Sequence, residues 1–228
     1  MQKLFIGLEG PIGIGKSHLT RKLAAKLGGL AMFEPVKTNP YLPYFYGKAE
    51  GVSMVEGMTR WTFPMQIHLL HARYILHQRA RVSPQTVVQD RTIYGDTVFA
   101  KSHYDDEIMS ELEWGTYQLA WEAMKQTLVY PDVMVFLDAP IEVLQRRIQE
   151  DRKRPEEEGI PDAYLGKLRN GYHTLRREVS GYTQVLSYDW IDPNSSFDEL
   201  VRDIQMVTQD RGFTWARRRP TLLPPEDA

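Results

Sequence analysis

The chain has 228 residues, 42% hydrophobic side chains and a formal net charge of −2, which suits one α/β domain and leaves no global basic field that would favour nucleic acid. It contains no cysteine, which excludes disulfides and thiolate metal sites, and no apolar run approaches the ~20 residues that span a bilayer. The first strand is expected within three residues of Met1, which leaves no room for a signal peptide, so we expect a cytoplasmic protein without a membrane or nucleic-acid partner.

The strongest motif lies near the N-terminus. The apolar run Leu4–Leu8 is expected to form a buried strand, and residues 10–17, GPIGIGKS, then fit the pattern GxxxxGK[ST] at every fixed position. Leucines recur every four residues over 19–27, so a helix is expected to start near Lys16. Strand, glycine-rich turn and helix N-terminus are the context that this phosphate-binding motif needs.

The residue types of this loop explain its chemistry. Glycines let several backbone N–H groups point at one anion, and the helix start adds further unpaired N–H groups. Lys16 supplies a positive charge for the outer phosphates, and Ser17 supplies a hydroxyl ligand for Mg²⁺. The predicted nucleotide-binding residues are Gly10, Gly13, Gly15, Lys16, Ser17, His18 and, in the turn after the last strand, Asp192.

Two acidic residues follow expected strands. Glu34 comes directly after the apolar run Leu30–Phe33, and Asp90 comes after the β-rich run Thr86–Val88. Open α/β sheets bind ligands at the carboxyl ends of their strands, so both acids are candidates for a site. Taken alone, Glu34 fits a surface turn residue better than a catalyst, because exposed glutamate is the common case.

The next region predicts a flap and a long helix. Residues 39–58 are rich in Pro, Gly and aromatic residues and are expected to form a loop with a short helical piece, whereas Trp61–Arg81 has the period of a helix. Gln66 and Arg73 are two turns apart and share a face of this helix. The expected buried stripe consists of Phe63, Ile67, Leu70 and Tyr74.

Two histidines on the same helix, His68 and His71, have a spacing that a metal site could use. No third ligand lies nearby in the sequence, so a solvated or packed pair is the better interpretation.

The second half of the chain alternates helices with short strands. Helices are expected over 107–129, 141–154, 162–180 and 197–211, and strands over 132–137 and 185–188. With the earlier strands this predicts a five-stranded parallel sheet with helices on both faces.

Two of these helices raise a functional question. The aromatic segment 107–129 is too apolar for a solvent-facing helix, so it is either central or a dimer face. The basic end of 141–154 fits either a solvated helix end or a cationic lid over phosphates.

In order along the chain, five stretches together resemble the deoxynucleoside kinase family, which includes deoxycytidine, deoxyguanosine and deoxyadenosine kinases. They are residues 9–17, 34–36, 60–66 with Arg73, 90–96 and 152–165. A phosphate loop alone is shared by many NTPases, whereas this ordered set is specific.

The resemblance implies an architecture. It is a P-loop fold of the nucleoside kinase type in a single domain over residues 1–212, with a flap at about 39–58 and a small Arg-rich lid at about 150–161. Residues 213–228 would be a C-terminal tail. The stretch Arg147–Arg152 departs from the family by one extra residue.

The resemblance also implies a role for each matching residue. Glu34 would take the proton from the 5′-hydroxyl of a deoxynucleoside, Arg91 would hold Glu34 and the 5′-oxygen, and Asp90 would act on Mg²⁺ beside Ser17. The other implied roles are base reading by Gln66, Arg73 and Asp96, binding of the 3′-hydroxyl by Tyr46 and Glu157, and contact with the transferring phosphoryl group by Arg152 and Arg154. Phosphoryl transfer needs this alignment, a base near the nucleophile and cations on the phosphoryl oxygens.

These roles predict an ATP- and Mg²⁺-dependent kinase, expected to be a homodimer, that converts a deoxynucleoside to its 5′-monophosphate. The base-reading trio suits a base with an exocyclic amine and a ring nitrogen, and the run Phe63–Gln66 looks closest to bacterial purine deoxynucleoside kinases, which favours deoxyadenosine or deoxyguanosine. The alternatives are a deoxycytidine kinase, a nucleoside-monophosphate kinase, which would need a further cationic group, and a non-catalytic structural subunit. The last should have lost Lys16, Glu34 or Asp90, and all three are present.

Overall fold

The computed structural model describes residues 3–34, 36–152 and 159–209. Five parallel strands form one sheet in the order β2-β3-β1-β4-β5, which confirms the predicted architecture. The strands are β1 (Phe5–Glu9), β2 (Leu30–Met32), β3 (Val87–Asp90), β4 (Val133–Asp138) and β5 (Gln184–Asp189). The central strands are buried along almost their whole length, as expected for a parallel sheet that is covered on both faces.

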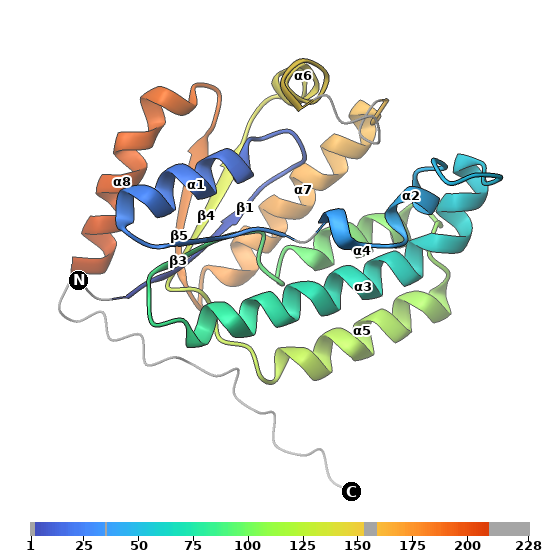
Figure 1. Ribbon diagram of the computed structural model, residues 1–228, viewed down its shortest axis with the longest axis horizontal. Coiled ribbons are helices and arrows are strands. Elements are labelled where there is room, and N and C mark those ends of the chain that lie inside the picture. The colour runs from blue at the N-terminus through green and yellow to red at the C-terminus, as the bar shows by residue number, and fades with distance from the viewer. Residues whose placement is uncertain (1–2, 35, 153–158, 210–228) are drawn as a thin grey trace, which may run out of the picture.

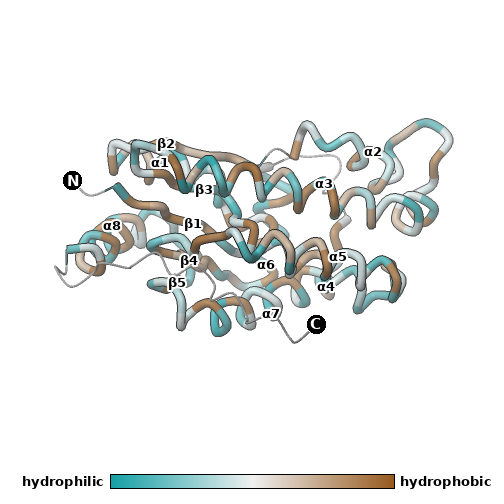
Figure 2. The backbone as a smooth tube through the Cα atoms, turned by 90° about the horizontal axis from the view of Figure 1, so that it is seen from below, coloured by the Kyte–Doolittle hydropathy of each residue, from teal (hydrophilic) through white to brown (hydrophobic). Residues whose placement is uncertain are grey.

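Helices cover the sheet on both sides (Figures 1 and 2). One side carries α1 (Lys16–Leu27) and α8 (Pro193–Gln209), and the other carries α3 (Met54–Val82), α4 (Asp96–Asp105) and α7 (Asp162–Val179). The remaining helical segments are a 3₁₀ turn at Val36–Thr38, α2 (Leu42–Phe45), α5 (Glu111–Lys125), α6 (Ile141–Arg146) and a π-helix at Arg147–Arg152. No helix among the described residues is long and apolar enough to span a bilayer.

The long helix α3 differs from its sequence prediction at its start and in its buried face. It begins at Met54 instead of Trp61, because the Ser53 side chain accepts a hydrogen bond from the Glu56 N–H and caps it. The last residues of the predicted flap therefore belong to this helix. Its fully buried residues include Thr62, Gln66, Leu69, Leu70, Arg73 and His77.

The predicted apolar stripe of α3 is confirmed in part. Leu70 is buried in the core, and Phe63, Ile67 and Tyr74 are partly buried and pack against it. The buried face also includes polar residues that the stripe did not contain. The reason is that Arg73 and His77 have polar partners inside the protein, so the burial of polar side chains on this face is compensated.

The aromatic helix is shorter than predicted. A capping box between Ser110 and Glu113 fixes the start of α5, so residues 107–110 lie outside the helix. Only Tyr117 is buried in α5, whereas Leu112 is 85% and Leu119 75% exposed. The helix is therefore not central: one side packs against the core, and the other exposes these leucines.

The helix after β4 changes its geometry within the stretch expected to be one residue longer than in the family. α6 continues as the π-helix Arg147–Arg152, in which hydrogen bonds close over five residues instead of four. A π-turn takes up one residue more than an α-turn, and the extra residue itself stays a prediction. The other predicted element boundaries differ from the observed ones by a few residues, as is usual for helix and strand ends.

Candidate active site

The phosphate loop joins β1 to α1, and its glycines adopt backbone angles that other residues avoid. Gly10, Gly13 and Gly15 have φ angles of 146°, 84° and 95°. A Cβ atom at Gly10 would lie 2.5 Å from the Leu137 carbonyl oxygen, and one at Gly13 would lie 2.8 Å from Ile148 Cγ1. The loop conformation thus depends on glycine at these positions.

Lys16 and Ser17, the first residues of α1, point into the loop and toward β3. The Lys16 ammonium donates hydrogen bonds to the carbonyl oxygens of Gly10 and Pro11, at 2.8 and 2.7 Å. The Ser17 hydroxyl donates to Asp90 Oδ2 at 2.5 Å. The two predicted Mg²⁺ ligands are therefore neighbours, although 73 positions separate them in sequence. A hydroxyl and a carboxylate, with phosphate oxygens and water, form the oxygen ligand set that Mg²⁺ takes at phosphate sites.

Glu34 lies just after β2 and is held by two arginines. Arg73 Nη2 donates to Glu34 Oε1, and Arg91 Nε lies 3.3 Å from Glu34 Oε2. The side chain of Glu34 is 10% exposed. Burial by itself would raise its pKa, but the charges of Arg73 and Arg91 outweigh it and hold the pKa of Glu34 below its ordinary value. The carboxylate is therefore ionised at neutral pH.

Arg73 extends this arrangement toward α4. Its Nη1 donates to Asp96 Oδ1, and Asp96 Oδ2 accepts a hydrogen bond from the Tyr117 hydroxyl at 2.6 Å. The two carboxylates raise the pKa of Arg73 against the opposing effect of burial, so the guanidinium stays charged. Glu34, Arg73, Asp96 and Tyr117 form one chain of hydrogen bonds.

Gln66 lies two turns from Arg73 on the buried face of α3. It is fully buried, and neither its amide nitrogen nor its amide oxygen has a hydrogen-bond partner among the described residues. An unsatisfied buried amide is costly in a folded protein, unless a ligand completes its bonds. Tyr46, at the end of α2, is half-buried, and its neighbour Phe45 packs with Met65 and Leu69 of α3.

The remaining predicted site residues lie outside the carboxylate–arginine cluster or outside the described part of the chain. His18 is exposed in the first turn of α1, and Asp192 is exposed before α8, where its carboxylate accepts from the Asn194 N–H at 3.0 Å. Arg152 ends the π-helix, while Arg154 and Glu157 lie outside the described residues.

Several residues of the site were not predicted from the sequence. Phe99 of α4 lies under two guanidinium groups, with its ring centre 5.6 Å from Arg73 Cζ and 4.7 Å from Arg91 Cζ. The Tyr172 hydroxyl of α7 accepts a hydrogen bond from Arg91 Nη1. Neither aromatic residue belongs to a local motif, so only the folded chain brings them to the site.

Arg147 and Glu9 were missed in the same way. Arg147 donates to the carbonyl oxygens of Ile14 and Ile191, at 3.4 and 3.0 Å, and so connects the phosphate loop with the turn that carries Asp192. Glu9, the last residue of β1, is fully buried beneath the Arg91 turn.

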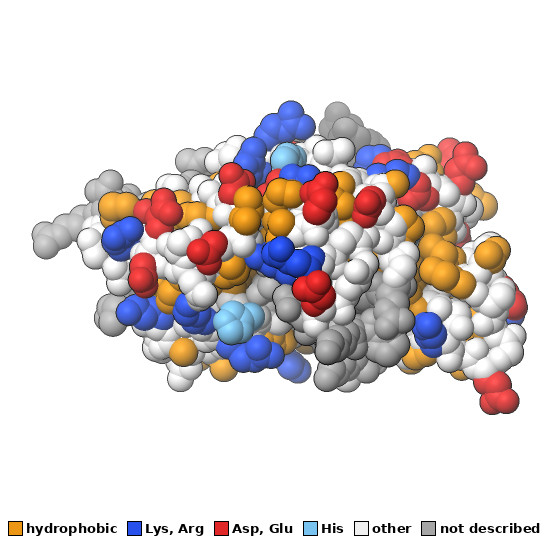
Figure 3. Space-filling model, turned by 90° about the horizontal axis from the view of Figure 1, so that it is seen from above, with side chains coloured by type: hydrophobic (Ala, Val, Ile, Leu, Met, Phe, Trp, Pro, Cys, Tyr) orange, Lys and Arg blue, Asp and Glu red, His pale blue; other side chains and the backbone are white. Residues whose placement is uncertain are grey.

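The face in Figure 3 carries Lys and Arg side chains interspersed with Asp and Glu. Among the described residues no three His, Asp or Glu side chains gather as a metal centre.

A phosphate loop beside a carboxylate–arginine cluster, at the carboxyl ends of β1, β2 and β3, defines a P-loop phosphotransferase. The chain belongs to the deoxynucleoside kinase family, since residues 6–209 match the family model described as "Deoxynucleoside kinase". This confirms the predicted family and the predicted class of enzyme.

Individual relatives agree with this assignment. The chain is 33% identical to the deoxyadenosine/deoxycytidine kinase of Bacillus subtilis (strain 168), over 90% of this chain and 93% of that protein. It is 31% identical to the deoxyadenosine kinase of Dictyostelium discoideum, over 95% and 84% of the two chains. Among solved structures, a deoxyadenosine kinase from M. mycoides superposes with a TM-score of 0.74 at 24% identity, over 88% of this chain and 98% of that one, which shows the shared fold.

Proposed function

We propose that this kinase transfers the γ-phosphoryl group of ATP to the 5′-hydroxyl of a purine deoxynucleoside. The observation that carries the proposal is the position of the Arg91 guanidinium. Its Nη1 donates to the Gly10 carbonyl oxygen of the phosphate loop at 3.1 Å, and its Nε lies 3.3 Å from Glu34. One side chain thus links the phosphate-binding loop to a candidate general base.

The proposed reaction needs few groups beyond those in place. The ionised Glu34 accepts the proton of the 5′-hydroxyl while the 5′-oxygen forms a bond to the γ-phosphorus. The bond from that phosphorus to the β–γ bridging oxygen breaks, and ADP leaves. Lys16 and Arg91 stabilise the charge on the phosphoryl oxygens. Mg²⁺, held by Ser17 and Asp90, would neutralise the outer phosphates.

For the lid we propose that Arg152 and Arg154 contact the phosphoryl group that is transferred. We propose that Tyr46 and Glu157 bind the 3′-hydroxyl of the deoxynucleoside. The segment 39–53 would act as the flap of a single domain over 1–212. His18 and Asp192 would line the ATP site beside Arg147.

The base preference rests on Gln66, Arg73 and Asp96. A buried amide with both atoms unsatisfied, on the same buried helix face as the arginine of a charged pair, suits a base that both donates and accepts, as adenine, guanine and cytosine do. Thymine offers carbonyls and one N–H, and its methyl group would press on the charged pair. The relative from B. subtilis is named for deoxyadenosine and deoxycytidine, and the one from D. discoideum for deoxyadenosine, which supports a purine with deoxycytidine as the second candidate.

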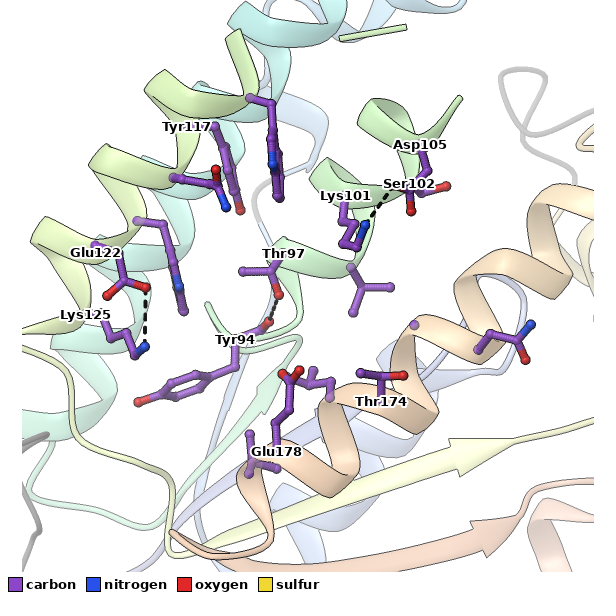
Figure 4. Close-up of a pocket in the computed structure, with 18 of the residues that line it drawn as sticks. Tyr94, Thr97, Lys101, Ser102, Asp105, Tyr117, Glu122, Lys125, Thr174 and Glu178 are labelled. Carbon is purple, nitrogen blue, oxygen red and sulfur yellow. Dashed lines mark hydrogen bonds and ion pairs between the residues drawn. The ribbon is translucent and has the colours of Figure 1, made fainter. Parts of the chain in front are cut away.

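We also propose a homodimer. A groove of about 900 Å³ lies between α4, α5 and α7, with aromatic walls that include Tyr94, Trp114 and Trp121 (Figure 4). Exposed Leu112 and Leu119 lie on the same helix, α5. Light scattering of the pure protein tests this directly, and a monomer at micromolar concentration would contradict it. A cytoplasmic location stays a prediction.

One assay separates the candidate functions. ADP release is measured with ATP and Mg²⁺ against the four deoxynucleosides and their monophosphates. Turnover with deoxyadenosine or deoxyguanosine supports the proposal, turnover only with monophosphates supports a nucleoside-monophosphate kinase, and no turnover with any acceptor supports a structural subunit.

A further inference from the structure

Glu9 is a buried acid to which the proposed reaction assigns no part. It ends β1, its exposure is 0%, and its carboxyl group lies against the turn that follows β3. Oε1 accepts two hydrogen bonds from Thr92, one from the backbone N–H at 2.8 Å and one from the hydroxyl at 2.6 Å. Oε2 has no hydrogen-bond partner among the described residues.

The turn that Glu9 touches holds Arg91 in an unusual backbone conformation. Arg91 has a φ angle of 61°, in the left-handed region that residues other than glycine seldom adopt. Such a conformation persists only where the surroundings enforce it, and it is typical of functional sites.

Three contacts fix the backbone on both sides of Arg91. Its N–H donates to the Leu8 carbonyl oxygen at 3.0 Å, and its carbonyl oxygen accepts from the Gln89 side-chain amide at 2.9 Å. The N–H of the next residue, Thr92, donates a hydrogen bond to Glu9 Oε1. Glu9 therefore holds the backbone on the C-terminal side of Arg91.

Gly95 leaves the space that the Glu9 carboxyl group occupies beside this turn. A Cβ atom at Gly95 would lie 2.3 Å from Glu9 Oε2, so only glycine there leaves room for the carboxyl group. Apolar packing does not explain this arrangement. Oε1 satisfies the N–H and the hydroxyl of Thr92, but Oε2 is buried without a partner among the described residues, which is destabilising compared with a well-packed apolar side chain.

We propose that Glu9 is a positioning residue for phosphoryl transfer, which holds the Arg91–Thr92 peptide so that the Arg91 guanidinium reaches both Glu34 and the phosphate loop. This inference rests on the proposed function. Glu9 acts through Arg91 and touches neither substrate.

The protonation of Glu9 decides which variant preserves this role. Burial raises the pKa of Glu9, against the lowering effect of Thr92 and Arg91. A protonated carboxyl group can keep Oε1 as an acceptor, and a glutamine side chain has the same shape with the same acceptor. Glu9→Gln is therefore the conservative variant. Glu9→Ala removes the acceptor oxygen, and Glu9→Asp shortens the side chain by one methylene, so that its oxygen lies farther from Thr92.

The test measures kcat and KM for these variants, alone and in an Arg91→Lys background. We expect Glu9→Ala to lower kcat about 10²-fold, the order of loss that a small misplacement of a catalytic group causes, with the KM for ATP little changed. We expect Glu9→Gln to stay within about threefold of the unmodified protein. In the Arg91→Lys background Glu9→Ala should cost less than about threefold, because residues that act as one unit have non-additive effects.

Controls separate positioning from folding. Leu200→Ala, in the buried face of α8, should lower the Tm without lowering kcat at a permissive temperature. Should Glu9→Ala fail to fold, Glu9→Asp takes its place with the same expected non-additivity. An effect of Glu9→Ala that multiplies with that of Arg91→Lys, or a loss in Glu9→Gln as large as in Glu9→Ala, would overturn the proposal.

A further measurement does not depend on activity. The ¹⁵N NMR signal of the Arg91 Nε–H, identified by its loss in Arg91→Lys, should shift in Glu9→Ala and stay in place in Glu9→Gln. If the unmodified protein phosphorylates no nucleoside, the proposed function fails, and an unshifted signal in Glu9→Ala would separately refute the positioning role.

Discussion

Glu34 and Asp96 are bonded to opposite nitrogen atoms of one guanidinium group, that of Arg73. The carboxylate proposed as general base and the carboxylate proposed to read the nucleobase therefore share one cation in a buried setting, where charges are poorly screened. A substitution at Asp96, which is proposed to recognise the nucleobase, should therefore change the electrostatic environment of Glu34, the proposed general base.

Glu34→Gln tests the general base. The variant keeps the size of the side chain and one acceptor oxygen for an arginine, so deoxynucleoside should still bind, while turnover falls by about 10²–10⁴-fold, the usual contribution of general-base catalysis. Single-turnover kinetics give the rate, and calorimetric titration gives the binding constant. The matched control is Glu56→Gln, an exposed glutamate at the start of α3. Near-normal turnover in Glu34→Gln would rule out this role.

Gln66→Met separates ligand binding from stability. The methionine fills similar space without two unsatisfied polar atoms, so we expect the free energy of unfolding to stay level or rise by about 1 kcal/mol. Deoxynucleoside binding should weaken by roughly 10²-fold or more, since polar groups of the base lose their partners. Gln205→Met, at an exposed position of α8, should change neither quantity appreciably. A stabilised variant with intact binding would show that Gln66 does not face the base.

The double change Arg73→Met with Asp96→Ala tests the base preference. We expect kcat/KM for thymidine to be the lowest of the four deoxynucleosides in the unmodified protein, and to rise relative to the purines in the variant, because the charged pair no longer opposes the thymine methyl group. Total activity should fall, since Glu34 also loses a cation. The exposed pair Lys167 and Asp106, changed in the same way, is the control. Thymidine as the best substrate of the unmodified protein would refute this assignment.

Two buried histidines predict acid sensitivity of the fold. Burial lowers the pKa of His77 to about 4, in spite of a hydrogen bond to the Val129 carbonyl oxygen, and lowers the pKa of His103 to about 4. In the unfolded chain both histidines take up a proton near pH 6.5, whereas in the folded protein they do so only near pH 4. Between these pH values the unfolded state binds more protons than the folded state, so the free energy of unfolding falls as the pH falls. Each histidine should cost on the order of 2 kcal/mol at pH 5 relative to pH 7.

Urea denaturation at the two pH values measures this loss. His103→Phe should reduce the pH dependence, because the ring lies between those of Phe45 and Tyr164 and a phenyl group can take its place. His71→Gln, at an exposed position of α3, should leave the dependence as it is. An identical pH dependence in His103→Phe and the unmodified protein would mean that His103 takes up its proton without unfolding.

The parts of the site that sequence could predict are those with a local signature. The phosphate loop is a contiguous motif, and Glu34, Asp90 and Arg91 follow apolar runs whose carboxyl ends a parallel sheet must bring to one edge. Arg73 and Asp96, both assigned to base reading from the resemblance, form an ion pair, whereas the link from Arg73 to Glu34 was not predicted.

What sequence could not predict depends on contacts between distant segments. Tyr172 and Phe99 are ordinary helix residues until the packing of α4 and α7 brings them to the arginines. The buried face of α3 was predicted only in part because an apolar pattern treats Arg73 and His77 as solvent-facing, whereas their partners come from other parts of the chain. The Ser53 cap of α3, the capping box of α5 and the π-helix likewise set helix ends that periodicity alone does not determine.

The left-handed backbone of Arg91 has a consequence for anyone who would engineer this enzyme for heat resistance. Glycine adopts this conformation without strain, so a substitution chosen on backbone preference alone would place glycine at position 91 and could gain up to ~1 kcal/mol. The same substitution would delete the guanidinium that joins the phosphate loop to Glu34. With the proposed role of Arg91, backbone preference and turnover conflict at position 91, and stabilising designs should leave it unchanged.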